Sequence, residues 1–267
     1  MSPAATEGPE EVGAVWLSTT VTRTMGGYGV HVFRAGRLLI DCGFTHAAKA
    51  FLGWSGLEGA EACLLTHHHE DHVGNAAALV ERGIGVRAPT PVARRLEDPP
   101  KLLPYQRMMW GTPEPVAVTA VDGATVAGDW RLVPIRTPGH APDHYVYHEP
   151  ERELVFTGDL YLGRRVEDIR RGEALGPLLE SLRRVQDLRP RALFCAHRGR
   201  IDRPAEALRA KIDWLEDLVA KARKLADGGA SVDEIRRRLL GREGLTYWVT
   251  AGDVCKRNLI EAALATW

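Results

Sequence analysis

The sequence from residue 66 to residue 72 reads Thr66-His67-His68-His69-Glu70-Asp71-His72, and it continues a short apolar run that predicts a β-strand, Ala62–Thr66. A loop at the end of a strand can direct alternating side chains toward one point, so His67 and His69 are placed to hold a metal ion. Asp71 and His72 are placed to reach a second ion, because imidazole and carboxylate groups are the usual ligands of zinc and similar cations. The alternative is a solvated polar loop or a chance histidine run, but a histidine tag would lie at a terminus.

Three more strand ends carry polar side chains of the same kind. A Pro-Gly turn ends in His140, the predicted strand Glu153–Thr157 is followed by Asp159, and the predicted strand Ala192–Ala196 is followed by His197. Each is weak evidence alone, since a single histidine after a strand is more often a surface or packing residue. Combined with the histidine cluster, they predict one site built from five histidines and two aspartates. The histidines without such a placement are interpreted as structural or surface residues: His31, His46 and His148.

The order, spacing and strand-end settings of these residues resemble the metallo-β-lactamase superfamily over residues 12–203. The resemblance implies an α/β (α+β) fold, a four-layer αβ/βα sandwich with the site along one edge of two facing sheets, followed here by a C-terminal helical extension. It also implies that Asp159 bridges two metal ions. The first ion would be bound by His67, His69 and His140, and the second by Asp71, His72 and His197.

The same resemblance assigns supporting positions to two further residues. Asp41 matches a family aspartate behind the ligands, where its hydrogen bond to a histidine would orient that ligand. His144 matches a position that binds no metal, and a structural role is expected for it. The stretches 137–144 and 158–163 resemble the glyoxalase-II-like group and a related small group that includes ribonucleases. The second ligand set contains Asp71 and no cysteine, which argues against cleavage of β-lactams.

The chain divides into three predicted parts: a flexible leader at residues 1–11, a catalytic domain at residues 12–203, and a C-terminal helical segment at residues 204–267. The first part has no basic segment followed by an apolar one, so it is not interpreted as a signal peptide. In the third part, apolar residues recur at helical spacing, and Ser231–Glu234 forms a capping box that predicts a helix start. The pattern does not decide whether these helices line the pocket or form a dimer interface.

Composition and charge exclude several classes of protein. Lys and Arg number 35 and so do Asp and Glu, so no overall basic charge favours a nucleic-acid partner. No apolar run approaches the roughly 20 residues of a membrane helix. The hydrophobic fraction is 45% and the charged fraction 26%, which are typical of a globular protein. The four cysteines are interpreted as buried free thiols in a cytoplasmic protein.

The predicted activity is hydrolysis at a binuclear metal site, in which a hydroxide that bridges the two ions attacks the substrate. A thioester, ester or lactone with a small-molecule acyl group is the favoured substrate, and Asp71 would orient the nucleophile or pass its proton to the leaving group. The alternative is a phosphodiesterase or endoribonuclease of the same fold, because the C-terminal third is rich in arginine. A third alternative is a non-enzymatic redox or binding protein that has kept the metals. The iron-dependent oxygen-reducing relatives, however, replace a ligand histidine with glutamate, and His69 is still histidine.

Zinc is the expected metal, although iron and manganese also suit nitrogen and oxygen ligands. Two segments are predicted to shape the pocket, residues 94–115 and residues 160–171. The first is rich in proline and carries apolar side chains that could cover an acyl group, and the second carries arginines that could bind a carboxylate or phosphate. Ordinary packing and a solvated basic loop are the respective alternatives. The predicted substrate contacts are Trp110, Tyr161, Arg164 and Arg165.

Overall fold

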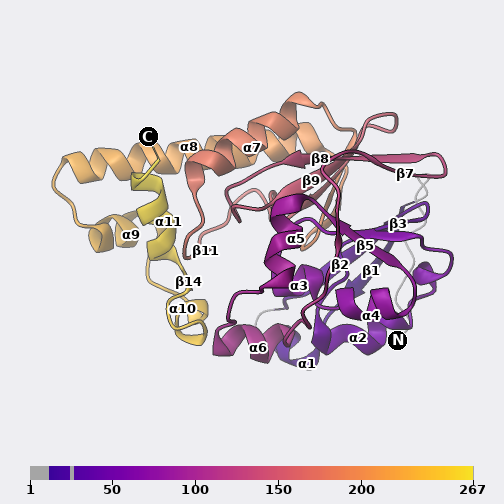
Figure 1. Cartoon of the computed structure of the whole chain (residues 1–267). Coiled ribbons are helices and arrows are strands. Elements are labelled where there is room, and N and C mark those ends of the chain that lie inside the picture. The colour runs from indigo at the N-terminus through magenta and orange to yellow at the C-terminus, as the bar shows by residue number, and fades with distance from the viewer. Residues whose placement is uncertain (1–11, 25–26, 267) are drawn as a thin grey trace.

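Two six-stranded β-sheets form the centre of the molecule, and helices cover the outer face of each (Figure 1). The computed structural model describes residues 12–24 and 27–266, and the expected leader at residues 1–11 lies outside them. Within the described residues the layers follow the order helices, sheet, sheet, helices. The predicted αβ/βα sandwich is therefore confirmed.

The first sheet has the strand order β1-β2-β3-β4-β5-β6. Strands β1 to β3 pair antiparallel, and β3 to β6 pair parallel. The tight turn between β2 and β3 contains Gly36 at φ 57°, a left-handed conformation that glycine adopts without strain. The strands are β1 Val12–Leu17, β2 Val30–Ala35, β3 Leu38–Ile40, β4 Ala62–Leu64, β5 Gly85–Ala88 and β6 Thr119–Ala120. The helices of this half are α1 Thr20–Thr24, α2 Ala48–Leu52, α3 Glu70–Val73, α4 Ala76–Glu81, α5 Thr90–Glu97 and α6 Pro104–Trp110.

The second sheet has the strand order β13-β12-β10-β9-β8-β7. Its central pair, β10 and β12, is parallel, and the chain crosses between these strands through helix α7, Leu175–Asp187. The hairpin predicted around residues 128 and 129 is confirmed as β7–β8. The strands are β7 Thr125–Ala127, β8 Trp130–Arg136, β9 Tyr145–Glu149, β10 Leu154–Gly158, β12 Ala192–Cys195 and β13 Gly199–Ile201.

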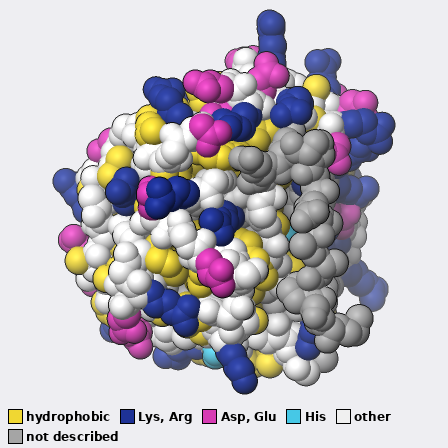
Figure 2. All heavy atoms as spheres, turned by 90° about the vertical axis from the view of Figure 1, so that its right-hand side faces the viewer, with side chains coloured by type: hydrophobic (Ala, Val, Ile, Leu, Met, Phe, Trp, Pro, Cys, Tyr) yellow, Lys and Arg dark blue, Asp and Glu magenta, His cyan; other side chains and the backbone are white. Residues whose placement is uncertain are grey.

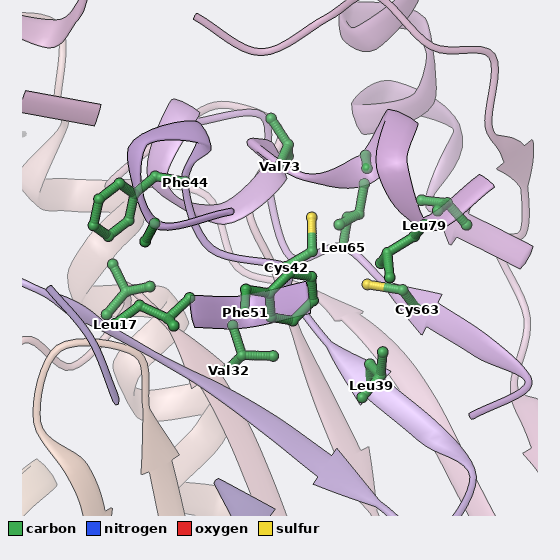
Figure 3. Packing of buried hydrophobic residues seen from close by; sticks show 14 of the residues in the cluster. Leu17, Val32, Leu39, Cys42, Phe44, Phe51, Cys63, Leu65, Val73 and Leu79 are labelled. Carbon is green, nitrogen blue, oxygen red and sulfur yellow. The ribbon is translucent and has the colours of Figure 1, made fainter. Parts of the chain in front are cut away.

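Three buried apolar clusters hold the four layers together, one at each interface between layers. Between the two sheets, Phe33 contacts Phe156 and Phe194, and Trp130 is fully buried. Between the first sheet and its helices, strand residues such as Val32 meet helix residues in the packing shown in Figure 3. The third cluster fills the space between the second sheet and the helices that cover it. Burial of this apolar surface is the main force that fixes the layers.

The C-terminal segment packs on the second sheet and reaches back toward the first half of the chain (Figure 1). It contains α8 Pro204–Asp227, α9 Val232–Leu240, α10 Leu245–Val249, β14 Val254–Cys255 and α11 Lys256–Leu264. Strand β14 pairs antiparallel with β11, Ile169–Arg170, in the loop that follows Asp159. The predicted capping box at Ser231 is confirmed at the start of α9. Apolar side chains of α8, α9 and α11 belong to one cluster with those of α7.

The surface and the cysteines agree with the composition. Figure 2 shows acidic and basic side chains interspersed on the face opposite the C-terminal helices. All four cysteines are free and buried, as predicted. Among the described residues, no helix combines the length and the apolar character that crossing a membrane requires. The segment 94–115, which had no predicted secondary structure, contains the end of α5 and all of α6.

Candidate metal centre

The seven predicted ligands come together at one edge of the sandwich because parallel strands end there side by side. In the first sheet Ile40 of β3 pairs with Leu64 of β4, which brings Asp41 beside the loop that starts at Thr66. In the second sheet β10 and β12 pair in parallel, which brings Asp159 beside His197. Carboxyl ends of neighbouring parallel strands lie at the same sheet edge. The topology thus delivers distant parts of the chain to one point.

The first group of donors is His67, His69, His140 and Asp159. The Nδ1 atom of His69 lies 2.9 Å from His67 Nε2 and 2.9 Å from His140 Nε2. The Asp159 Oδ2 atom lies 3.3 Å from His140 Nε2. In a tetrahedral zinc site with bonds of about 2.0–2.1 Å, neighbouring ligand atoms are about 3.3 Å apart. The spacing of these four donors therefore suits a small divalent cation.

The second group is Asp71, His72, Asp159 and His197. The His197 Nε2 atom lies 3.3 Å from Asp71 Oδ2 and 3.3 Å from Asp159 Oδ2. The His72 Nε2 atom lies 3.4 Å from Asp159 Oδ1 and 3.8 Å from Asp71 Oδ2. Asp159 is the member that both groups share, and its Oδ2 lies 3.3 Å from His140 Nε2 of the first group as well as 3.3 Å from His197 Nε2 of the second. This is the arrangement expected of a carboxylate between two cations.

Two buried atoms in these groups support a fit to metal ions. His72 Nε2 and Asp159 Oδ1 are buried and have no hydrogen-bond partner among the described residues. A buried polar atom without a partner is unfavourable by about 1–3 kcal/mol, so such atoms call for an explanation. Both atoms point into the second donor group, where a cation would satisfy them. Nitrogen and carboxylate donors without a thiolate suit zinc, iron or manganese.

Each of four ligand histidines has one ring nitrogen held by a partner and directs the other nitrogen toward the donor groups. His72 Nδ1 donates to Asp41 Oδ2 at 2.7 Å. The partners of the other three are Thr66 Oγ1 for His67 at 3.0 Å, Glu173 Oε2 for His140 at 3.2 Å, and the Gly29 carbonyl for His197 at 2.7 Å. Such bonds fix the tautomer and the ring orientation of a metal-binding histidine.

Asp41 has a special backbone position as well as a central set of bonds. Its φ is 61°, in the left-handed region that Asp and Asn tolerate better than most residues. Its Oδ1 accepts from the Thr66 amide at 2.8 Å, and its Oδ2 accepts from the Thr66 hydroxyl at 2.9 Å. Because the hydroxyl donates to Asp41, it accepts from His67 Nδ1. One carboxylate thus orients a histidine from each donor group.

His144 supports the bridging aspartate and faces no ion-binding position. Burial lowers the pKa of His144 to about 3, so the ring is neutral. Its Nε2 accepts from the Asp159 amide at 3.1 Å, and its Nδ1 donates to Thr137 Oγ1 at 2.9 Å. Gly158, at φ 47°, lets this ring approach, since a Cβ there would lie 2.9 Å from His144 Nε2. His144 therefore fixes the backbone at Asp159.

The carboxylates of the site are kept in their charged form by the histidines around them. Burial alone would raise the pKa of Asp71, but His72 and His197 beside it bring the pKa below its usual value. Burial also opposes ionisation of Asp159, and the same two histidines hold its pKa well below the usual range. By contrast, burial lowers the pKa of His67 well below its ordinary value. Charged carboxylates and a neutral imidazole are the forms that bind metal ions.

The donor groups lie on the floor of a cavity of about 550 Å³. Trp110 and Arg165, two of the predicted substrate contacts, line this cavity, and Arg165 also pairs with Glu167 at 2.8 Å. Tyr161 and Arg164 are not among the described residues that line the cavity. Tyr161 is instead buried in the cluster under the C-terminal helices, with Arg164 beside it.

Sequence reasoning missed a network around Arg170, which also lines the cavity. Its guanidinium binds Glu70 Oε1 at 3.1 Å and lies 3.8 Å from Asp253 Oδ2. Its amide donates to Glu173 Oε1 at 2.8 Å, and the other oxygen of Glu173 holds His140. Gln106 of α6 donates to the same Glu70 oxygen at 2.9 Å. Glu70 lies within the histidine-rich stretch but was given no role there, and no local pattern marked the other members.

Of the arginines in the C-terminal third, Arg198 lines the cavity, and those named next do not. Among the described residues that line it, none is Arg183, Arg184 or one of residues 236–238. Arg183 pairs with Glu216 at 2.5 Å, and Arg236 lies 3.5 Å from Glu243. The Arg183–Glu216 pair is exposed, as is typical of a solvated helix face.

A buried site of histidines and aspartates at the edge of an αβ/βα sandwich defines a class of metal-dependent hydrolases. Residues 32–197 match the Metallo-beta-lactamase superfamily, and the chain belongs to this superfamily. The prediction of a metal-dependent hydrolase is confirmed at this level, because relatives with a named activity are hydrolases.

The relatives and a solved structure show how far the similarity extends. The chain is 28% identical over 259 residues to an atrochrysone carboxyl ACP thioesterase of Aspergillus fumigatus, covering 85% of this chain and 75% of that protein. It is 31% identical over 133 residues to a hydroxyacylglutathione hydrolase of Cereibacter sphaeroides, covering 50% and 46%. A metallo-beta-lactamase family protein from Thermus thermophilus has a TM-score of 0.68 at 20% identity, covering 95% and 91%, which supports the fold.

Proposed function

We propose that the protein is a binuclear metal-dependent hydrolase that cleaves a carboxylic thioester, ester or lactone with a small-molecule acyl group. The observation that carries the proposal is the pair of four-donor groups that share Asp159 on the floor of one cavity. The named activities of two relatives, a thioesterase and a hydroxyacylglutathione hydrolase, support the thioester as the first substrate to test. The four buried free cysteines suit a reducing cytoplasm.

The proposed ligand set assigns His67, His69 and His140 to one ion, and Asp71, His72 and His197 to the other, with Asp159 between them. When bound, the two ions supply Lewis acidity toward a carbonyl oxygen and lower the pKa of a water molecule toward neutrality. Zinc is the first choice for reconstitution, with iron and manganese as alternatives.

The chain itself contributes orientation and proton transfer. Asp71 lines the cavity as a carboxylate, with its Oδ2 3.3 Å from His197 Nε2. It is the group proposed to take a proton from the attacking water and to pass it to the leaving group. In a thioester the carbon–sulfur bond breaks, the thiolate leaves and receives this proton, and the acyl group leaves as a carboxylic acid.

The test is a hydrolysis screen of the metal-reconstituted protein against acyl thioesters, lactones, simple esters, phosphodiesters and short RNA. The variant His140→Ala should lose both turnover and part of the bound metal, because His140 Nε2 belongs to the first donor group. His148→Ala is the matched control, since His148 lies on β9 outside both groups. Turnover of phosphodiesters or RNA alone would refute the acyl substrate class, and full turnover in His140→Ala would refute the metal site.

A further inference from the structure

The cavity above the donor groups has two walls that come from distant parts of the chain. Helix α6 contributes Tyr105, Met109 and Trp110, and helix α10 of the C-terminal segment contributes Leu245 and Val249. The floor carries histidines and carboxylates, whereas the residues named on these walls are apolar or aromatic. A pocket with an apolar body and a few converging polar groups is the usual form of a small-molecule site.

The wall from α6 is rigid because its side chains belong to the apolar core. Trp110 packs edge-on against Phe44, with ring centroids 4.9 Å apart, and all three cavity residues of α6 are buried. Their spacing, at positions 105, 109 and 110, places them on one face of the helix. This face serves the core and the cavity at the same time, so little ordering is needed when a ligand lies on it.

The wall from α10 is different, because apolar side chains there face open space. Leu245 is 68% exposed, and it lines the cavity with Thr246, Val249 and Thr250 from the same helix face. Trp16 and Tyr28 extend the apolar rim from the first half of the chain, and each is about 40% exposed. Exposed apolar side chains that line a cavity with a polar floor can be covered by a ligand.

The two walls are tied to each other and to the donor groups. The Tyr105 hydroxyl of α6 donates to Oδ2 of Asp253, a residue just after α10, at 2.6 Å. Strand β14, which follows, pairs with β11, and Arg170 is one of the paired β11 residues. Arg170 in turn binds Glu70, which lies between two proposed ligands in the sequence. The distance between the apolar walls is therefore set by bonds that also hold the metal-binding loop.

We infer that the enzyme selects acyl groups with a large apolar body, which lies between α6 and α10, over short or polar acyl groups. This inference rests on the proposed acyl hydrolysis and adds the specificity of the same site. Each methylene buried between the walls contributes about 0.8 kcal/mol, which corresponds to about a 4-fold increase in kcat/KM. The increase continues until the cavity of about 550 Å³ is filled.

The test is a series of saturated acyl thioesters of one thiol, from acetyl to dodecanoyl, with kcat/KM measured for each. The double variant Leu245→Ser, Val249→Ser should reduce the increase per methylene from about 4-fold to below about 2-fold. Trp248→Ser is the matched control, because this side chain lies on α10, is 74% exposed and does not line the cavity. It should retain the wild-type dependence on length.

Binding of the product acids gives a second measurement that does not depend on turnover. Decanoate should bind the wild-type protein at least 10-fold more tightly than acetate, and the double variant should lose this preference. Equal kcat/KM at all chain lengths, or an unchanged dependence in the double variant, would overturn the inference but leave acyl hydrolysis standing. No hydrolysis at any length would overturn the proposed function together with the inference.

Discussion

The substitution Asp41→Asn isolates what the buried carboxylate behind the donor groups does. Asp41 Oδ2 lies 2.7 Å from His72 Nδ1, and its oxygens also accept from the Thr66 amide and hydroxyl at 2.8 and 2.9 Å. Asn has the same size and also tolerates the backbone at φ 61°. Its amide nitrogen, however, must face a donor on either Thr66 or His72. If it faces His72, the ring moves its proton to Nε2 and loses the lone pair that a metal ion requires.

The expected loss is selective for one of the two ions. Removing a group that orients a metal-binding histidine typically weakens the affinity 10- to 100-fold, or by about 1.4–2.7 kcal/mol. His72 belongs to the second donor group, so the second equivalent of metal should be the one affected. The first group should change less, because Asp41 reaches His67 only through the Thr66 hydroxyl.

The assay is a zinc titration in competition with a chromophoric chelator, which resolves the two equivalents. Asp143→Asn is the matched control, since Asp143 is equally buried and lies 2.8 Å from His68 Nδ1, a histidine outside both donor groups. It should leave both zinc affinities unchanged. The reasoning is refuted if Asp41→Asn binds both equivalents as tightly as the wild type, or if Asp143→Asn weakens them equally.

Three further predictions concern stability and the loops that carry the ligands. Phe156→Ala removes a fully buried ring between the sheets, 5.0 Å from the Phe194 ring, and should lower the free energy of unfolding in urea by about 3–5 kcal/mol. Gly139 has φ 141°, and Gly139→Ala would place a Cβ 2.5 Å from Leu178 Cα, so the substitution should displace His140 and reduce the metal content measured by elemental analysis. Gly123→Ala, at a position with open space around it, should leave the metal content unchanged. Burial lowers the pKa of Lys211 to about 8, so above pH 8 the unfolded chain keeps a proton on this amine that the folded chain has lost. The free energy of unfolding should therefore rise between pH 8 and 10.5, by at most about 3 kcal/mol. Lys211→Met should remove this rise in pH-dependent denaturation curves.

The fold was predicted from the resemblance to the superfamily, and the candidate ligands could be recognised because they lie in short stretches. Strands of three to five residues end at Leu64, Gly158 and Cys195, and the polar residues just beyond them are visible in the sequence without knowledge of packing. The two parallel strand pairs then bring these ends to one sheet edge, as the order of strands requires. A side chain whose position follows from the end of a strand is therefore predictable from a motif.

The residues that were missed owe their place to contacts between distant elements. Arg170 and Glu173 lie in a segment with no periodic pattern. They reach the site because β11 pairs with β14, and the paired residues Ile169 and Cys255 are more than eighty positions apart in the chain. Helix α10 has only five residues, too few for a clear helical period. Neither feature leaves a local signal in the chain.

The same distinction separates the proposed metal ligands from the proposed acyl-binding wall. The proposed ligands belong to strand ends that the two-sheet core fixes, so the reaction depends on the part of the chain shared with the superfamily match at residues 32–197. The apolar wall on α10 lies outside that match and is joined to it by the Tyr105–Asp253 hydrogen bond and the β11–β14 pair. Substitutions in α10 that leave the Tyr105–Asp253 hydrogen bond and the β11–β14 pair intact are therefore expected to alter the proposed acyl selection without moving a proposed ligand. For this reason the chain-length experiment can separate substrate selection from hydrolysis.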